Sequence, residues 1–134
     1  MKSKLAAFAV GATLLLGALP SMAHHSFDAE YDRSKQRDFT GVVTKVEWMN
    51  PHARFYMDVK EADGKTVNWE FELGSPNGLQ RSGWTRTSLK VGDKITCHGS
   101  LAKDGANLAN ASNLTLADGR KVGAASSGDS ATGK

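Results

Sequence analysis

The chain has 134 residues, with 17 lysines and arginines against 14 aspartates and glutamates and a net charge of +3 at pH 7. That length suits one domain with a modest core. No basic run typical of nucleic-acid binding is present, which argues against a nucleic-acid partner. With a single cysteine, Cys97, the chain closes no internal disulfide, and we expect this thiol to lie buried and inert in the core.

Residues 1–23 have the pattern of a secretory signal peptide. A positively charged start precedes an uncharged apolar run over 5–19, and Ser21 and Ala23 are the small residues typical of a cleavage site. The apolar run is about 15 residues long, shorter than the roughly 20 that span a bilayer. We therefore expect a periplasmic or secreted protein that keeps no membrane span after cleavage near Ala23.

The segment after the leader is polar and irregular over residues 24–37, and we expect it to form an N-terminal arm. Phe27 and Tyr31 are four residues apart, a spacing that allows one helical turn. The first strand is predicted over 39–49. Its alternation predicts that three apolar residues share one face, namely Val42, Val46 and Trp48.

Two strands that alternate more strictly are predicted over 53–60 and 66–73. Asp63-Gly64 joins them, and this dipeptide is favoured in tight hairpin turns. One face of the hairpin is apolar throughout and is expected to form core: Ala53, Phe55, Met57, Val59, Val67, Trp69, Phe71 and Leu73. Glu70 and Glu72 fall on the opposite face, where we expect them to be solvated.

A short helix is predicted next, because Ser75 suits its N-cap and Pro76 its first helical position. Strands at 94–101 and 108–116 follow. The barrel domain is expected to span 38–122. Residues 123–134 are rich in glycine, serine and alanine, a composition that predicts a disordered tail.

The order of these elements is three strands, a short helix and two strands. It predicts an all-β fold, a small five-stranded OB-like barrel with one short helix between strands 3 and 4. An open antiparallel sheet or half-sandwich is the alternative. The barrel is favoured because closing the sheet leaves no exposed edges.

The histidines are the candidate chemical groups. Cleavage after Ala23 would leave the α-amine of His24 beside the imidazoles of His24 and His25, and such nitrogen donors favour Cu(II), Zn(II) or Ni(II) over Cu(I). His52 follows a proline at the corner between the first two strands and is the third candidate metal ligand; a histidine that caps the turn is the structural alternative. His98 is expected to lie exposed on the surface.

Several motifs together resemble one family of small exported bacterial proteins that has no established activity. The motifs are His24-His25-Ser26-Phe27, the segment 41–48, Asn50-Pro51-His52 and the segment 68–76. The resemblance covers roughly residues 23–122 and implies a periplasmic OB-like barrel. This chain departs from the family pattern at Arg54, where an aromatic residue is usual, and the departure weakens the case for an aromatic binding face.

These features together lead us to expect a non-enzymatic periplasmic binding protein that holds copper or another divalent metal at His24, His25 and His52. The alternative is an exported protein-interaction or small-ligand module that acts through Arg54 and Tyr56 and has no metal role. An oxidative copper enzyme is a weaker hypothesis, because no substrate surface can be assigned. The sequence contains no nucleophile elbow, phosphate-binding loop or dinucleotide motif.

Overall fold

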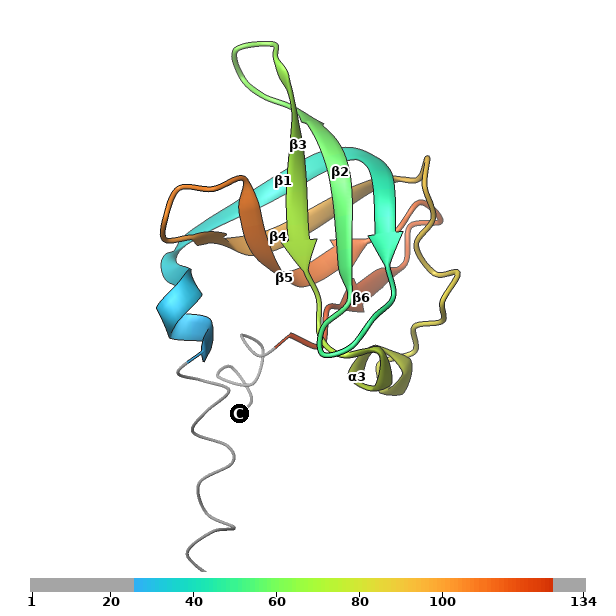
Figure 1. Cartoon of the computed structure of the whole chain (residues 1–134). Helices are drawn as coiled ribbons and strands as arrows, with labels where there is room; N and C mark the ends of the chain where they lie inside the picture. The colour runs from blue at the N-terminus through green and yellow to red at the C-terminus, as the bar shows by residue number, and fades with distance from the viewer. Residues whose placement is uncertain (1–25, 127–134) are drawn as a thin grey trace, which may run out of the picture.

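Hydrogen bonds between distant segments of the chain close the sheet into a barrel (Figure 1). The structure is a computed structural model that describes residues 26–126. Its strands are β1 (Tyr31–Glu47), β2 (Arg54–Lys60), β3 (Thr66–Glu72), β4 (Lys94–Ala102), β5 (Leu108–Thr115) and β6 (Lys121–Gly123), and helix α3 (Pro76–Arg81) lies between β3 and β4. A helical turn over residues 26–30 precedes β1. None of the helices in this described region is long and apolar enough to cross a membrane.

The pairing of β3 with β5 completes the ring. Strand β3 is antiparallel to β2 on one side and parallel to β5 on the other, where Phe71 pairs with Ala109 and Glu72 with Asn110. The ring therefore runs β1-β2-β3-β5-β4 and back to β1. This connectivity confirms the expected five-stranded OB-like barrel and its helix, and it excludes an open sheet. Strand β6, which pairs with β5, was not predicted.

Strand β1 is longer than the sequence pattern indicated, because it begins at Tyr31 inside the predicted arm. Its first part pairs with β4 and its last part with β2, and Gly41 and Val42 pair with both. A Cβ at Gly41 would lie 2.3 Å from the carbonyl oxygen of Asp58. Glycine is therefore needed where β1 turns from one neighbour to the other.

A β-bulge changes which side of β1 faces the core. The register with β2 shifts between Val43 and Lys45. As a result Val43 is buried and Val42 is 42% exposed, whereas Val46 and Trp48 beyond the bulge still pack against the core. The prediction that Val42 shares a face with Val46 and Trp48 is therefore wrong, because the extra residue of the bulge reverses the alternation.

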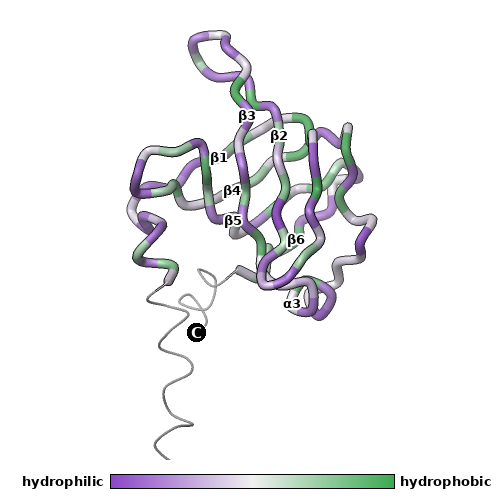
Figure 2. Tube along the Cα trace, in the orientation of Figure 1, coloured by the Kyte–Doolittle hydropathy of each residue, from purple (hydrophilic) through white to green (hydrophobic). Residues whose placement is uncertain are grey.

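The core follows the predicted inward faces of β2 and β3, whose alternation is visible along both strands (Figure 2). Phe55 stacks on Phe71 with ring centroids 4.7 Å apart, and Phe39 meets Phe71 edge to face at 4.9 Å. Cys97 is fully buried, as expected. Ser75 caps α3 by accepting a hydrogen bond from the Gly78 amide at 3.1 Å, which confirms the predicted start of the helix.

Residues 123–126 belong to the fold, which corrects the predicted disordered tail. Ala124 is fully buried, and its carbonyl oxygen accepts a hydrogen bond from the Gly74 amide at 2.8 Å. The Trp84 indole donates to the carbonyl oxygen of Gly123 at 2.9 Å. Small residues permit this close packing, so their composition does not indicate disorder here. Residues 127–134, the rest of the predicted tail, lie outside the described residues.

Candidate functional site

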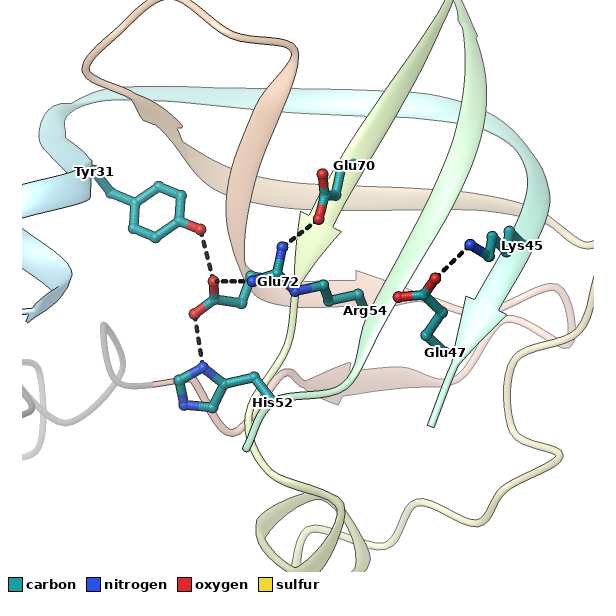
Figure 3. Close-up of polar contacts among 7 residues, drawn as sticks. All are labelled: Tyr31, Lys45, Glu47, His52, Arg54, Glu70 and Glu72. Atoms are coloured by element: carbon teal, nitrogen blue, oxygen red, sulfur yellow. Dashed lines mark hydrogen bonds and ion pairs between the residues drawn. The ribbon is translucent and has the colours of Figure 1, made fainter. Parts of the chain in front are cut away.

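A polar network lies on the outside of the barrel, where β3 ends and β2 begins (Figure 3). Its centre is the carboxylate of Glu72. One oxygen, Oε1, lies 3.0 Å from Nδ1 of His52. The other, Oε2, accepts a hydrogen bond from the Tyr31 hydroxyl at 2.9 Å and lies 3.5 Å from Nη2 of Arg54. Arg54 also forms an ion pair with Glu70.

Glu72 is buried although it points away from the core. It is 5% exposed, because the partners that surround it cover the outer face of the strand at this point. The expectation that Glu72 is solvated is therefore wrong. A buried carboxylate is tolerated when hydrogen bonds and opposite charge satisfy it, and Glu72 has both.

Tyr31, the first residue of β1, donates its hydroxyl hydrogen bond to Glu72. Burial first, and then the neighbouring charge of Glu72, raise the pKa of the Tyr31 hydroxyl far above its ordinary value. The hydroxyl therefore stays protonated and donates to Glu72. Because Tyr31 begins β1, this bond ties the start of the barrel wall to the end of β3.

His52 is presented by the loop between β1 and β2, with its side chain 38% exposed. Within residues 26–126, the Glu72 carboxylate is its polar partner. Nδ1 faces this carboxylate, and Nε2 lies on the far side of the ring from Glu72 (Figure 3). Carboxylates commonly orient metal-ligating imidazoles in this way.

Several acidic side chains surround the network. Partial burial raises the pKa of Glu30, and the carboxylates of Glu72, Asp104 and Glu70 raise it further, against the opposing charge of Arg54. The first cause is burial, so the raised pKa chiefly reports that Glu30 is partly covered where it lies near these charged side chains.

The structure describes one of the three predicted metal ligands. His24 and His25 lie outside the described residues, and His52 is at the network just described. Within residues 26–126, no group of three or more histidine, cysteine, aspartate or glutamate side chains is arranged to hold a metal ion. A metal at His52 would therefore need further ligands from elsewhere in the chain.

His98 and Cys97 offer no alternative ligand. Nδ1 of His98 lies 2.6 Å from Asp38 and Nε2 lies 3.1 Å from Gln36, so both ring nitrogens are engaged. Its side chain is 37% exposed. Burial raises the pKa of the Cys97 thiol well above its ordinary value, which keeps it protonated. A protonated, buried thiol is a poor ligand and a poor nucleophile.

The face that holds Arg54 and Tyr56 carries charges that pair with one another. Lys45 pairs with Glu47 and lies 5.1 Å from the centre of the Tyr56 ring, while Arg54 pairs with Glu70. The positive charges of Lys45 and Arg54 are therefore largely neutralised by Glu47 and Glu70. The arrangement gives no continuous positive track of the kind that follows a nucleic-acid backbone.

Residues 12–111 match the DUF6152 family, described as a family of unknown function. The chain belongs to this family. No curated protein matches the chain. Membership of DUF6152 confirms the resemblance to an uncharacterised family and brings no known activity with it.

The solved structures similar to this DUF6152 protein include the mitochondrial single-stranded DNA-binding protein Rim1 of S. cerevisiae. One crystal form has a TM-score of 0.47 and 8% identity, over 61% of this chain and 92% of Rim1. A second form has a TM-score of 0.45 and 6% identity, over 61% and 91%. Similarity this weak carries no information about what the DUF6152 chain binds.

Sequence reasoning missed Glu72 and Tyr31 as members of the site. Alternation along β3 correctly turned Glu72 away from the core, yet nothing local indicated what would cover it. The one signal in the sequence was the spacing of Phe27 and Tyr31, which allows a turn with both rings on one face. That spacing indicates an arm that packs on something, and a buried acid is a natural partner for a tyrosine hydroxyl.

Proposed function

We propose that this protein is an exported metal-binding protein that holds a divalent ion, copper foremost, between its mature N-terminus and His52. The observation that carries the proposal is the pair of His52 and Glu72. The buried carboxylate engages Nδ1 and leaves Nε2 as the nitrogen that can accept a metal. A histidine serving only as a turn cap would not require a buried carboxylate behind it.

The other donors would come from the start of the mature chain. Cleavage after Ala23 would provide the α-amine and imidazole of His24 together with the imidazole of His25. With His52, these groups make an all-nitrogen set that suits Cu(II) or Zn(II). The ion would be bound for buffering or delivery, without a chemical reaction of its own.

The connectivity of the chain supports a single site formed by the mature N-terminus and His52. His25 is bonded to Ser26, the first described residue, and the helical turn that follows leads to Tyr31. A helix advances about 1.5 Å per residue, so Ser26 is roughly 8 Å along the axis from Tyr31. The Tyr31 hydroxyl donates to the Glu72 carboxylate, and Nδ1 of His52 lies 3.0 Å from the same carboxylate. The surrounding carboxylates would also offset the charge of a bound cation.

A competition titration on protein exported and processed by its own signal tests the proposal. The mature mass is checked, and Cu(II) and Zn(II) affinities are then measured against a chelator of known affinity. We expect one tightly bound ion. We expect His52→Ala, and separately a glycine added before His24, each to weaken the affinity by about tenfold or more.

The matched control is His98→Ala, because both nitrogens of His98 are engaged by Asp38 and Gln36. This variant should bind like the wild type. Equal affinity in the wild type, His52→Ala and the extended chain would overturn the proposal. A wild type that binds no stoichiometric metal would also overturn it, and would favour an exported interaction module acting through Arg54 and Tyr56.

A further inference from the structure

We infer that residues 26–35 form a strap, which opens and closes over the outer face of the barrel while the barrel stays folded, and that the hydrogen bond from Tyr31 to Glu72 is its latch. The closed strap buries the Glu72 carboxylate, and the open strap presents this carboxylate to solvent. Access to the polar network around Glu72 therefore depends on the position of the strap.

Contacts within the strap make it a unit. The ring centroids of Phe27 and Tyr31 are 5.4 Å apart. The Arg33 guanidinium lies 4.2 Å from the centre of the Phe27 ring, and its Nε pairs with the Asp28 carboxylate at 2.7 Å. Both partners in each of these contacts belong to the strap, so the contacts can persist when the strap leaves the barrel.

A break in strand pairing joins the strap to the rest of β1. The pairing of β1 with β4 is interrupted between Tyr31 and Gln36. Ser34 and Lys35 lie in this interruption and are exposed. The Asp32 carboxylate accepts a hydrogen bond from the Ser34 amide at 2.9 Å, which closes a local turn. Because the ladder of hydrogen bonds does not continue through this stretch, the backbone can rotate here while β1 stays paired with β4 from Gln36 onward.

The strap is docked by a small hydrophobic cluster of its own. Phe27 is 3% exposed and Tyr31 2% exposed, and they pack with Ala102 and the partly buried Leu108. This cluster is separate from the main core of the barrel. Apolar burial stabilises in proportion to the area that is covered, so these few side chains hold the strap less firmly than the core holds the strands. The strap can therefore open at a lower free energy than the barrel unfolds.

Hydrogen bonds attach the strap to the barrel at two places. The Lys103 amide donates to the carbonyl oxygen of Glu30 at 2.9 Å, and the Lys103 ammonium donates to that of Asp28. These three residues are exposed, so water can replace their hydrogen bonds. The bond from the Tyr31 hydroxyl to Oε2 of Glu72, at 2.9 Å, joins two buried residues. This buried bond to a charged acceptor is the stronger attachment, which makes it the latch.

The barrel continues to satisfy Glu72 when the strap opens. Oε1 lies 3.0 Å from Nδ1 of His52 and Oε2 lies 3.5 Å from Nη2 of Arg54, and neither partner belongs to the strap (Figure 3). Asn110, the neighbour of Glu72 on β5, is 2% exposed, and its Nδ2 has no hydrogen-bond partner among the described residues. A buried donor without a partner is unfavourable, and exposure to water relieves it. Opening at Tyr31 therefore leaves no charge uncompensated and lets water approach the Asn110 amide.

Thiol labelling on the processed protein, without added metal, tests the strap. Ala102→Cys places a thiol beneath the strap, and the native Cys97, fully buried in the barrel, is the internal reference. Far-UV circular dichroism establishes that the variant is folded. Iodoacetamide labelling is then followed at each site by peptide mass spectrometry. We expect the thiol introduced at position 102 to react about tenfold faster than Cys97 or more, because strap opening exposes it and only unfolding of the barrel exposes Cys97.

Tyr31→Phe, added to Ala102→Cys, tests the latch. It removes one hydroxyl group, and we expect labelling at position 102 to become about tenfold faster, because a hydrogen bond to a charged group is lost. Labelling of Cys97 should stay the same. Tyr56→Phe is the matched control, because Tyr56 lies on β2 and its removed hydroxyl is not part of the strap or its attachments. This control should change neither rate.

Equal labelling rates at position 102 and at Cys97 would overturn the strap, since one global opening would then expose both thiols. Equal acceleration of both sites by Tyr31→Phe would overturn the latch, since the substitution would then weaken the whole barrel. If Ala102→Cys does not fold, hydrogen exchange of the wild type decides the question. Amides of residues 26–35 that exchange through an opening of lower free energy than the amides of β4 support the strap, and exchange of both through the same opening overturns it.

Discussion

At the scale of single residues, Glu72 is the centre of the polar network, with three side-chain partners within residues 26–126. It is a buried carboxylate contacted by the Tyr31 hydroxyl, from the start of β1, and by the His52 imidazole and the Arg54 guanidinium, from one short segment at the start of β2. Removing it would leave the Tyr31 hydroxyl without an acceptor in a buried position. Its contribution is therefore both to stability and to the orientation of His52.

Glu72→Ala should lower the free energy of unfolding by about 3 kcal/mol, since it leaves buried polar partners unpaired. The matched control is Glu47→Ala, which removes a glutamate that pairs with Lys45, itself 59% exposed. An ion pair with an exposed lysine contributes little to stability, so this control should change the free energy of unfolding little. Urea unfolding monitored by tryptophan fluorescence measures both. Equal effects of the two substitutions would contradict the role assigned to Glu72.

Glu61 gives a pH prediction at the same scale. Hydrogen bonds from Arg37 and from the Trp69 indole lower its pKa below the ordinary value of 4.5. A lowered pKa in the folded state gives stability that is present above 4.5 and is lost as the pH falls through the folded-state value. Glu61→Gln should therefore be less stable than the wild type at pH 7, and the difference should shrink in acid.

Chemical denaturation of Glu61→Gln and the wild type between pH 3 and pH 7 tests this pH dependence. A stability difference that is the same at both ends of the range would show that the charge of Glu61 is irrelevant. Asp58→Asn serves as the control, because the Asp58 carboxylate accepts a hydrogen bond from the exposed side-chain amide of Asn68. Because this hydrogen bond is exposed, Asp58→Asn should change the free energy of unfolding little.

At the scale of elements, the segment 123–126 closes the end of the barrel next to α3. The Gly74 amide bonds to the carbonyl oxygen of Ala124. A Cβ at position 74 would lie 1.9 Å from the carbonyl oxygen of Ala125, which is far inside van der Waals contact. The backbone of the segment can approach β3 this closely because position 74 has no side chain.

Gly74→Ala should therefore destabilise the protein by about 3 kcal/mol, because either the segment or the end of β3 must move. Gly123→Ala is the matched control, since a Cβ there meets nothing within 4 Å. Thermal unfolding of the two variants and the wild type makes the comparison. A Gly74→Ala protein as stable as Gly123→Ala would mean that the segment is not held against Gly74.

At the scale of the whole molecule, the local patterns predicted most of the barrel. Strict alternation and Asp63-Gly64 identified the hairpin of β2 and β3, and Ser75-Pro76 identified α3. The bulge in β1 could not be predicted, because a one-residue shift leaves no clear mark in the sequence. Only the β1 residues before the bulge were therefore assigned to the wrong face.

The candidate site was predicted only in part. His52 stood out because it follows a proline at a strand corner. The burial of Glu72 depends on Tyr31, which is 41 residues away in sequence. The closing pair of β3 and β5 likewise brings Glu72 beside Asn110. Such long-range contacts arise from closure of the barrel, and no short sequence window contains both partners.

The most direct test of the proposed metal site is Cu(II) EPR, with pulsed detection of imidazole nitrogens, on the processed wild type and His52→Ala. We predict one stoichiometric, nitrogen-rich species in the wild type and the loss of one coordinated imidazole in His52→Ala. A weak, heterogeneous signal that is identical in the two proteins would contradict the site. It would show that His52, although oriented by Glu72, does not bind the ion.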